Sequence, residues 1–193
     1  QILEDIGLMR MLPGMTVICP IDANQTRQAV LALVDHQGPA YLRFGRPDWP
    51  VFTDAETPFV IGKADRLGSG TDVSLFATGH MVWNAVEAAK SLEARGVSVD
   101  VISVPTIKPL DADTILDSFS KTHCGVVCEE HQINGGLGDA IAHLVTQNKP
   151  YPLEFVGVND KFGESGKPLD LLKKYGLDAE DIVAAAHKVL KRK

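Results

Sequence analysis

Apolar and polar residues in the first 45 positions follow helical and strand spacing in turn. Ile2, Ile6 and Met9 share one face of a short helix, which Pro13-Gly14 ends. Beyond it, the pattern predicts a strand over Met15–Cys19, a helix that Asp22 or Asn24 caps and Gly38 ends, and a strand over Ala40–Phe44. The first block is therefore expected to be helix, strand, helix, strand.

A second alternation of strands and helices begins near residue 71. Strands are predicted over Val73–Ala77, Val99–Ser103, Gly125–Cys128 and Leu153–Val156, and helices over 81–95, 113–119, 136–145, 168–175 and 178–190. A loop is expected around Pro105 and Pro109. Four strands linked by helices predict a doubly wound, mostly parallel α/β domain.

Prolines and glycines are concentrated between Arg46 and Asp72, where long apolar runs are few. This composition is typical of a connection between domains, and it leaves room for a short strand at Phe59–Ile61. We therefore predict a first domain over residues 1–57, a linker over 58–70 and a second domain over 71–193.

Composition excludes several classes of protein. No apolar run approaches the roughly 18 residues needed to cross a bilayer, so we expect no membrane association. The 19 basic and 25 acidic residues give a formal net charge of -6, and no basic face is visible that would bind nucleic acid. The three cysteines, Cys19, Cys124 and Cys128, do not form a zinc pattern and favour a reducing cytoplasm. Because the chain starts with Gln1 and not Met, inside a predicted element, we expect a truncated or cleaved chain.

The first candidate site is the segment 42–47, Leu-Arg-Phe-Gly-Arg-Pro, at the end of a predicted strand. Ligands of α/β proteins bind beyond the carboxyl ends of strands. Alternation places Arg43 and Phe44 on opposite faces, while Arg46 lies past the strand, where its guanidinium could hold an anion. The alternative is that both arginines are surface salt-bridge partners.

The second candidate is the segment 127–138, where a strand end carrying Glu129, Glu130 and His131 meets a glycine-rich helix start. Free N–H groups there could bind an anion, and the three side chains could perform acid–base chemistry. The alternative is structural: the two carboxylates would satisfy helix N-termini, and the glycines would permit close packing.

The third candidate is the segment 160–168, whose Lys161 and Lys167 could close over an acidic ligand. The favoured interpretation is again structural, with Ser165 capping a helix that Pro168 begins. His80, at the end of a predicted strand, is a weaker candidate.

In this order, the segments resemble the C-terminal part of transketolases over essentially the whole chain. Residues 3–17, 20–24 and 41–47 resemble the end of the family's pyrimidine-binding domain. Residues 77–86, 129–138, 162–168 and 171–177 resemble its C-terminal domain. The ordered series is more specific than any single segment. The resemblance implies a partial pyrimidine-binding α/β domain followed by a complete C-terminal α/β domain.

The resemblance also implies a function. Transketolases use thiamine diphosphate and a divalent cation, Mg²⁺ or Ca²⁺, to move a two-carbon ketol unit between sugar phosphates. The family binds diphosphate and metal in an N-terminal domain with a Gly-Asp-Gly motif, which this chain lacks. The activating glutamate also precedes the matched region. We therefore expect a fragment or subunit that is inactive alone and binds no cofactor by itself, within a homodimeric cytoplasmic enzyme completed by an N-terminal portion.

Arg46 is the one family residue that can be carried over, because it resembles the arginine that binds the terminal phosphate of the substrate. Three alternatives remain open: a fragment of a deoxyxylulose-phosphate synthase, a fragment of a 2-oxoacid dehydrogenase beta subunit, and a non-catalytic dimerisation or interaction module. The segment 162–168 favours transketolase over the other enzymes.

Overall fold

The computed structural model describes residues 2–193, so Gln1, the first position of the predicted first domain, lies outside the described residues. The first block contains α1 (Asp5–Met11), β1 (Thr16–Ile18), α2 (Ala23–Val34) and β2 (Ala40–Leu42). Strands β1 and β2 are parallel, as expected when a helix connects them. The predicted order of the first block is confirmed.

The second block contains the predicted elements and two further strands. Its elements are β3 (Asp65–Arg66), β4 (Val73–Ala77), α3 (Met81–Glu93), β5 (Val99–Ser103), β6 (Thr106–Lys108), α4 (Ala112–Thr122), β7 (Gly125–Gln132), α5 (Leu137–Asn148), β8 (Leu153–Val158), α6 (Pro168–Lys174) and α7 (Ala179–Leu190). No helix among residues 2–193 combines the length and the apolar character that a membrane span needs.

Five strands form the larger sheet in the order β3-β5-β4-β7-β8. The chain passes from β4 to β5 on one side and then returns to place β7 on the other side of β4, with β5, β4, β7 and β8 all parallel. Only the short edge strand β3 is antiparallel. The prediction of a doubly wound, mostly parallel domain is confirmed.

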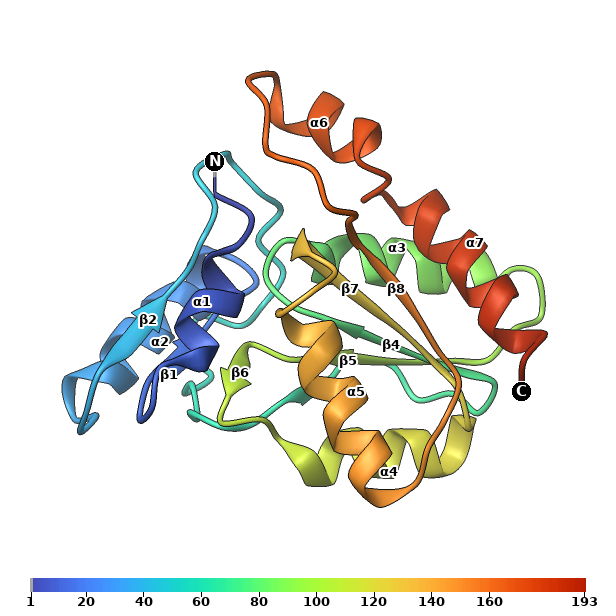
Figure 1. Ribbon diagram of the computed structural model, residues 1–193, viewed down its shortest axis with the longest axis horizontal. Helices are drawn as coiled ribbons and strands as arrows, with labels where there is room; N and C mark the ends of the chain where they lie inside the picture. The colour runs from blue at the N-terminus through green and yellow to red at the C-terminus, as the bar shows by residue number, and fades with distance from the viewer. Residues whose placement is uncertain (1) are drawn as a thin grey trace.

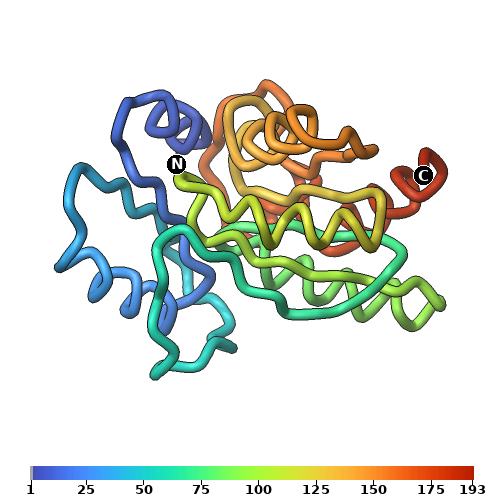
Figure 2. The backbone as a smooth tube through the Cα atoms, turned by 90° about the horizontal axis from the view of Figure 1, so that it is seen from below, coloured from blue at the N-terminus to red at the C-terminus, as the bar shows by residue number. Residues whose placement is uncertain are grey.

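Helices cover both faces of this sheet (Figure 1). Alternation along β4 sends Val73, Leu75 and Ala77 into a core with α3 and α7, whereas Phe76 enters a second core with α4 and α5. That second core continues into the first block through Ile6 of α1. The two blocks are therefore packed together through shared apolar contacts, side by side as in Figure 2.

The predicted loop around Pro105 and Pro109 is partly wrong, because β6 lies inside it. Strand β6 pairs antiparallel with β1, so the smaller sheet has the order β2-β1-β6 and includes a strand from each block. The side chain of Ile107 is buried in the shared core. Such a short β-branched segment becomes a strand because the edge of β1 lies beside it.

The predicted strand at Phe59–Ile61 is also wrong. These residues form no strand, and the chain meets a sheet edge only at Asp65 and Arg66, which pair with Ser103 and Ile102 of β5. A strand needs a hydrogen-bonding partner, and the linker reaches one four residues later than its apolar residues indicate.

Candidate functional site

The segment from Arg43 to Trp49, which we name the Arg46 loop, follows the carboxyl end of β2. Its start is fixed by the backbone N–H of Arg43, which donates to the carbonyl of Ile18 in β1 at 2.8 Å. Arg46 is exposed, and within residues 2–193 its side chain makes no hydrogen bond or ion pair. A free guanidinium at a strand end is the arrangement that the sequence indicates for binding an anion.

Arg43 has the opposite environment. Its side chain is only 15% exposed, and its Nη2 donates to the carbonyl of Glu130 at 2.8 Å. The Arg43 Nε atom lies 3.5 Å from the Asp5 carboxylate, and its Nη1 lies 3.8 Å from that of Glu130. Burial alone would lower the pKa of Arg43, but its charged neighbours, the Glu130 and Asp5 carboxylates among them, oppose this and the pKa is raised. The structural interpretation therefore holds for Arg43.

Tyr41 extends this network within the first block. Its hydroxyl donates to Asp5 Oδ2 at 2.8 Å, and burial together with this carboxylate raises the pKa of Tyr41 to about 12. Asp5 thus accepts from Tyr41 of β2 and lies in an ion pair with Arg43, which joins α1 to the start of the Arg46 loop. The sequence carries no signal for this role of Asp5, because an acidic residue in the first turn of a helix is common.

His80 of the second block contacts the Arg46 loop at two positions. Its ring stacks on the indole of Trp49, with centroids 4.5 Å apart and planes inclined by 14°. A Cβ atom on Gly45 would overlap His80 Cε1, so any other residue there would displace the His80 ring. On the other side, His80 Nδ1 lies 3.8 Å from the Glu130 carboxylate. Sequence reasoning gave His80 little weight and missed Trp49.

Glu129 caps the N-terminus of α5. Its carboxylate accepts from the backbone N–H groups of Leu137 and Gly138 at 2.7 and 2.8 Å. Burial raises the pKa of Glu129, although these two hydrogen bonds oppose the shift. A Cβ on Gly136 would overlap Glu129 Oε2, so the glycines permit close packing, as the structural alternative predicts. The helix start is therefore filled by a carboxylate from the same chain.

Two further structural assignments from sequence need correction. Glu130 caps no helix, because its carboxylate faces Arg43 and His80 instead. Ser165 does not cap α6: the N-cap is Lys167, without a side-chain hydrogen bond, and Pro168 begins the helix as predicted. The chain from 159 to 170 is exposed throughout, so its two lysines lie in solvent and enclose no ligand within this chain.

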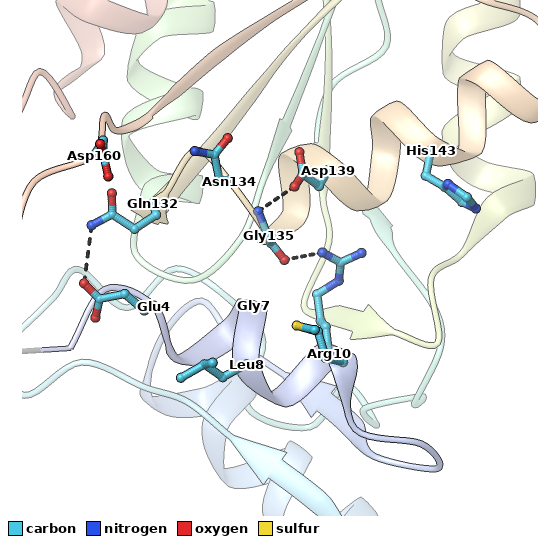
Figure 3. Close-up of a pocket in the computed structure, with 11 residues that line it drawn as sticks. Glu4, Gly7, Leu8, Arg10, Gln132, Asn134, Gly135, Asp139, His143 and Asp160 are labelled. Atoms are coloured by element: carbon cyan, nitrogen blue, oxygen red, sulfur yellow. Dashed lines mark hydrogen bonds between the residues drawn. The ribbon is translucent and has the colours of Figure 1, made fainter.

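A cavity of about 660 Å³ lies between α1 and the start of α5 (Figure 3). Three carboxylates line it: Glu4, Asp139 and Asp160. Its one guanidinium, that of Arg10, points at the carbonyls of Gly135 and Gly136, donating to the latter at 2.6 Å. With its cation engaged and an excess of acidic groups, the cavity does not suit an anionic sugar derivative. Arg46 does not line it.

The residues present do not form a site for a diphosphate and its metal. Among residues 2–193 no three His, Cys, Asp or Glu side chains are placed to hold a metal ion, and the chain contains no Gly-Asp-Gly sequence. The three cysteines are buried free thiols. Burial raises the pKa of Cys19 and Cys128, which keeps both as neutral apolar groups. What this chain offers chemically is therefore an exposed guanidinium on a loop that His80 and Glu130 contact.

Comparison with known proteins covers the whole chain. The family model for the transketolase C-terminal domain matches residues 62–182, and that for the transketolase pyrimidine-binding domain matches residues 1–51. A 6-deoxy-6-sulfo-D-fructose transketolase subunit from Clostridium sp. (strain MSTE9) is 42% identical over 191 residues, which are 99% of this chain and 59% of the relative.

Two other proteins are also similar. An apulose-4-phosphate transketolase subunit from Phocaeicola vulgatus is 36% identical over 191 residues, 98% of this chain and 61% of that protein. A solved structure, described as a split gene transketolase in an inactive beta4 tetramer, matches with a TM-score of 0.96 and 43% identity, covering 99% of this chain and 63% of its own. The chain thus spans about three fifths of these relatives.

Proposed function

The chain belongs to the transketolase family, and on that premise we propose that it is the C-terminal section of an enzyme that moves a two-carbon ketol unit between sugars. At least one of these sugars carries an anionic terminal group. The contribution of this section is to bind that group through Arg46 and to hold the loop that presents it. Resemblance and strand-end position favour Arg46 independently.

The observation that carries the proposal is the contrast between the two arginines of one loop. Arg43 is fully engaged with carboxylates and a carbonyl, while Arg46 is exposed and makes no ion pair within residues 2–193. The names of two relatives specify a sulfonated and a phosphorylated sugar. Both groups are oxyanions, for which the planar fork of an arginine is well suited.

The proposal includes a partner that supplies the diphosphate and metal sites. Thiamine diphosphate and Mg²⁺ or Ca²⁺ would be held by the N-terminal portion of the enzyme, since the residues of this chain do not fit them. The similar structure named an inactive tetramer of beta chains supports the expectation that this section alone is inactive. That name describes a tetramer and gives no support to the predicted homodimer, which stays a prediction.

Two further expectations remain part of the proposal. The domain limits are kept as residues 1–57, 58–70 and 71–193. A cytoplasmic location is supported by the three free thiols, because reducing compartments preserve them.

The test is to combine the chain with the N-terminal portion, thiamine diphosphate and Mg²⁺, and to measure ketol transfer from a ketose phosphate. We expect Arg46→Ala to raise KM for the phosphorylated substrate. The factor should correspond to a binding free energy on the order of 1.5–3 kcal/mol, the value of a hydrogen bond to a charged group. Arg46→Lys keeps the charge but lacks the planar fork of the guanidinium, so its KM should lie between those of the wild type and Arg46→Ala.

Arg95→Ala is the matched control, because Arg95 is an exposed arginine just beyond α3. An unchanged KM in Arg46→Ala would remove Arg46 from the site. Absence of ketol transfer in the complete mixture would contradict the enzyme proposal and favour a non-catalytic interaction module. Release of carbon dioxide from pyruvate, with no ketol transfer, would favour the deoxyxylulose-phosphate synthase alternative.

A further inference from the structure

Two residues of the second block, His80 and Glu130, contact the Arg46 loop at its start and at its end. Arg43, at the start of the loop, donates to the Glu130 carbonyl at 2.8 Å and lies 3.8 Å from the Glu130 carboxylate. Gly45 lies so close to His80 that no Cβ would fit between them. Trp49, at the end of the loop, stacks on the same imidazole at 4.5 Å. Arg46 lies between the two positions that His80 contacts.

His80 and Glu130 occupy a particular place in the larger sheet. Ala77, the last residue of β4, pairs with Cys128 of β7. His80 therefore lies just beyond the carboxyl end of β4, and Glu130 lies in the last residues of the neighbouring strand β7. Between β4 and β7 the chain reverses its winding direction. In doubly wound folds this is the crevice where ligands bind.

In this protein the crevice is filled by the first block of the same chain. The backbone N–H of Gly79 donates to the carbonyl of Cys19 at 3.2 Å, and a Cβ on Gly79 would lie 2.7 Å from Cys19 Sγ. The indole of Trp49 packs on the core of α3 and α7. The surface that commonly binds a ligand therefore supports a loop of the neighbouring domain.

The His80 ring contacts both Gly45 and Trp49 of the loop. The indole N–H of Trp49 is buried and makes no hydrogen bond within residues 2–193, so its position depends on packing and on the stacked ring. The side chain of His80 is 11% exposed and lies against Glu130. Removing the ring would leave Gly45 and Trp49 without their common neighbour.

We propose that His80 and Glu130 are positioning residues of the anion-binding site, which fix the Arg46 loop so that the guanidinium meets the terminal oxyanion of the substrate. This inference rests on the proposed function of Arg46. It gives the C-terminal domain a role in substrate affinity, since both residues belong to it. Neither residue touches the substrate; both act through the backbone that carries Arg46.

The kinetic test uses the complex with the N-terminal portion and compares a ketose phosphate with its dephosphorylated form. We expect His80→Ala to raise KM for the phosphate roughly tenfold, because small misplacements of a binding group are costly, with a smaller change in kcat. The loss in kcat/KM should be greater for the phosphorylated ketose. In an Arg46→Ala background, His80→Ala should raise KM little further, because both changes weaken the same interaction between Arg46 and the substrate.

The direct test is hydrogen–deuterium exchange of residues 43–49 in the same complex. His80→Ala should accelerate this exchange, whereas Arg46→Ala and the control His143→Ala should not, because His143 is exposed on α5. Gly45→Ala offers a second route to the same defect, since its methyl group would displace His80. His80→Phe, which retains a flat ring, should recover part of the lost affinity.

These outcomes separate the two proposals. If the complex shows no ketol transfer, the proposed function fails, and the exchange measurement still tests the support of the loop. Unchanged exchange in His80→Ala would overturn the inference. An additive loss of affinity in the double variant would also overturn it, because His80 would then act independently of Arg46.

Discussion

Arg43 and Arg46 are three residues apart and have opposite environments. The side chain of Arg43 is turned into the junction between the blocks and meets Asp5 and Glu130, while that of Arg46 remains in solvent. Strand alternation correctly placed Arg43 and Phe44 on opposite faces, since Phe44 is 61% exposed. It could not identify the carboxylates that engage Arg43, because they come from residues 5 and 130.

The burial of His80 predicts that its contribution to stability depends on pH. Burial lowers the pKa of His80 below its ordinary value of about 6.5; the Arg43 charge acts in the same direction, and Glu130 opposes both. The unfolded chain therefore takes up a proton at higher pH than the folded chain. The contribution of His80 to stability is complete above about pH 6.5 and decreases as the pH falls from there toward the folded pKa.

An NMR titration of the His80 imidazole should give a midpoint below 6.5. Urea unfolding should also show a smaller difference between the wild type and His80→Gln at pH 5.5 than at pH 7.5. A His80 midpoint at or above 6.5 would contradict this prediction.

At the level of elements, Asp22 and Asp178 are both helix caps and differ in what else they hold. Asp22 accepts from the N–H of Gln25 at the start of α2, and also from Phe52 and Thr53 of the segment leading into the linker. Asp178 caps α7 within a capping box, and among the described residues 2–193 it has no such long-range partner. The sequence predicts Asp22 or Asn24 as a cap, but gives no indication that Asp22 also anchors residues 52 and 53.

Asp22→Ala should therefore cost more than Asp178→Ala. Loss of a cap costs about 1 kcal/mol, and the additional hydrogen bonds to a charged acceptor bring the expected loss for Asp22→Ala to about 2–4 kcal/mol. Urea unfolding of both variants at pH 7 would measure this. Although burial alone would raise the pKa of Asp22, its hydrogen bonds lower it, so the difference from wild type should shrink as the pH falls below about 4. Equal losses of unfolding free energy in the two variants would show that the contacts of Asp22 with Phe52 and Thr53 contribute nothing to stability.

Most elements could be predicted because their signals are local. Helices α3 and α7 have apolar residues at helical spacing, and the glycines that follow α3 and α6, Gly96 and Gly176, have positive φ, as is common where a helix ends. The two short strands could not be predicted in the same way. Strand β6 depends on β1, some 90 residues earlier, and β3 depends on β5, so each is defined by a distant partner.

On the scale of the whole molecule, the first block has an unpaired edge and an uncovered helix. Within residues 2–193, strand β2 pairs only with β1, so its other edge is free. Helix α2 exposes Val30, Leu31 and Val34, which lie within one turn of one another on its outer surface, and Val34 is 75% exposed. Exposed apolar patches of this kind mark interaction surfaces. We expect the N-terminal portion of the enzyme to cover this face and to complete the smaller sheet.

Val34→Asp should therefore weaken association with the N-terminal portion by roughly tenfold or more, because the change both removes apolar burial and places a charge in the contact. Sedimentation or calorimetric titration would measure it. Val60→Asp is the control, since Val60 is 57% exposed on the linker. If both variants bind equally well, the outer face of α2 is not the contact surface.

The sequence by itself determined the type and order of most elements, the doubly wound second domain, the family and Arg46 as the candidate. These follow from local spacing, caps and ordered motifs, which a linear chain displays directly. Only the tertiary structure decided that Arg43 is engaged with Asp5 and Glu130, that Glu129 fills the start of α5, and that His80 and Glu130 contact the Arg46 loop. Those decisions depend on contacts between residues that are far apart in the chain or that face one another only after the sheet has formed, and local pattern carries no information about them.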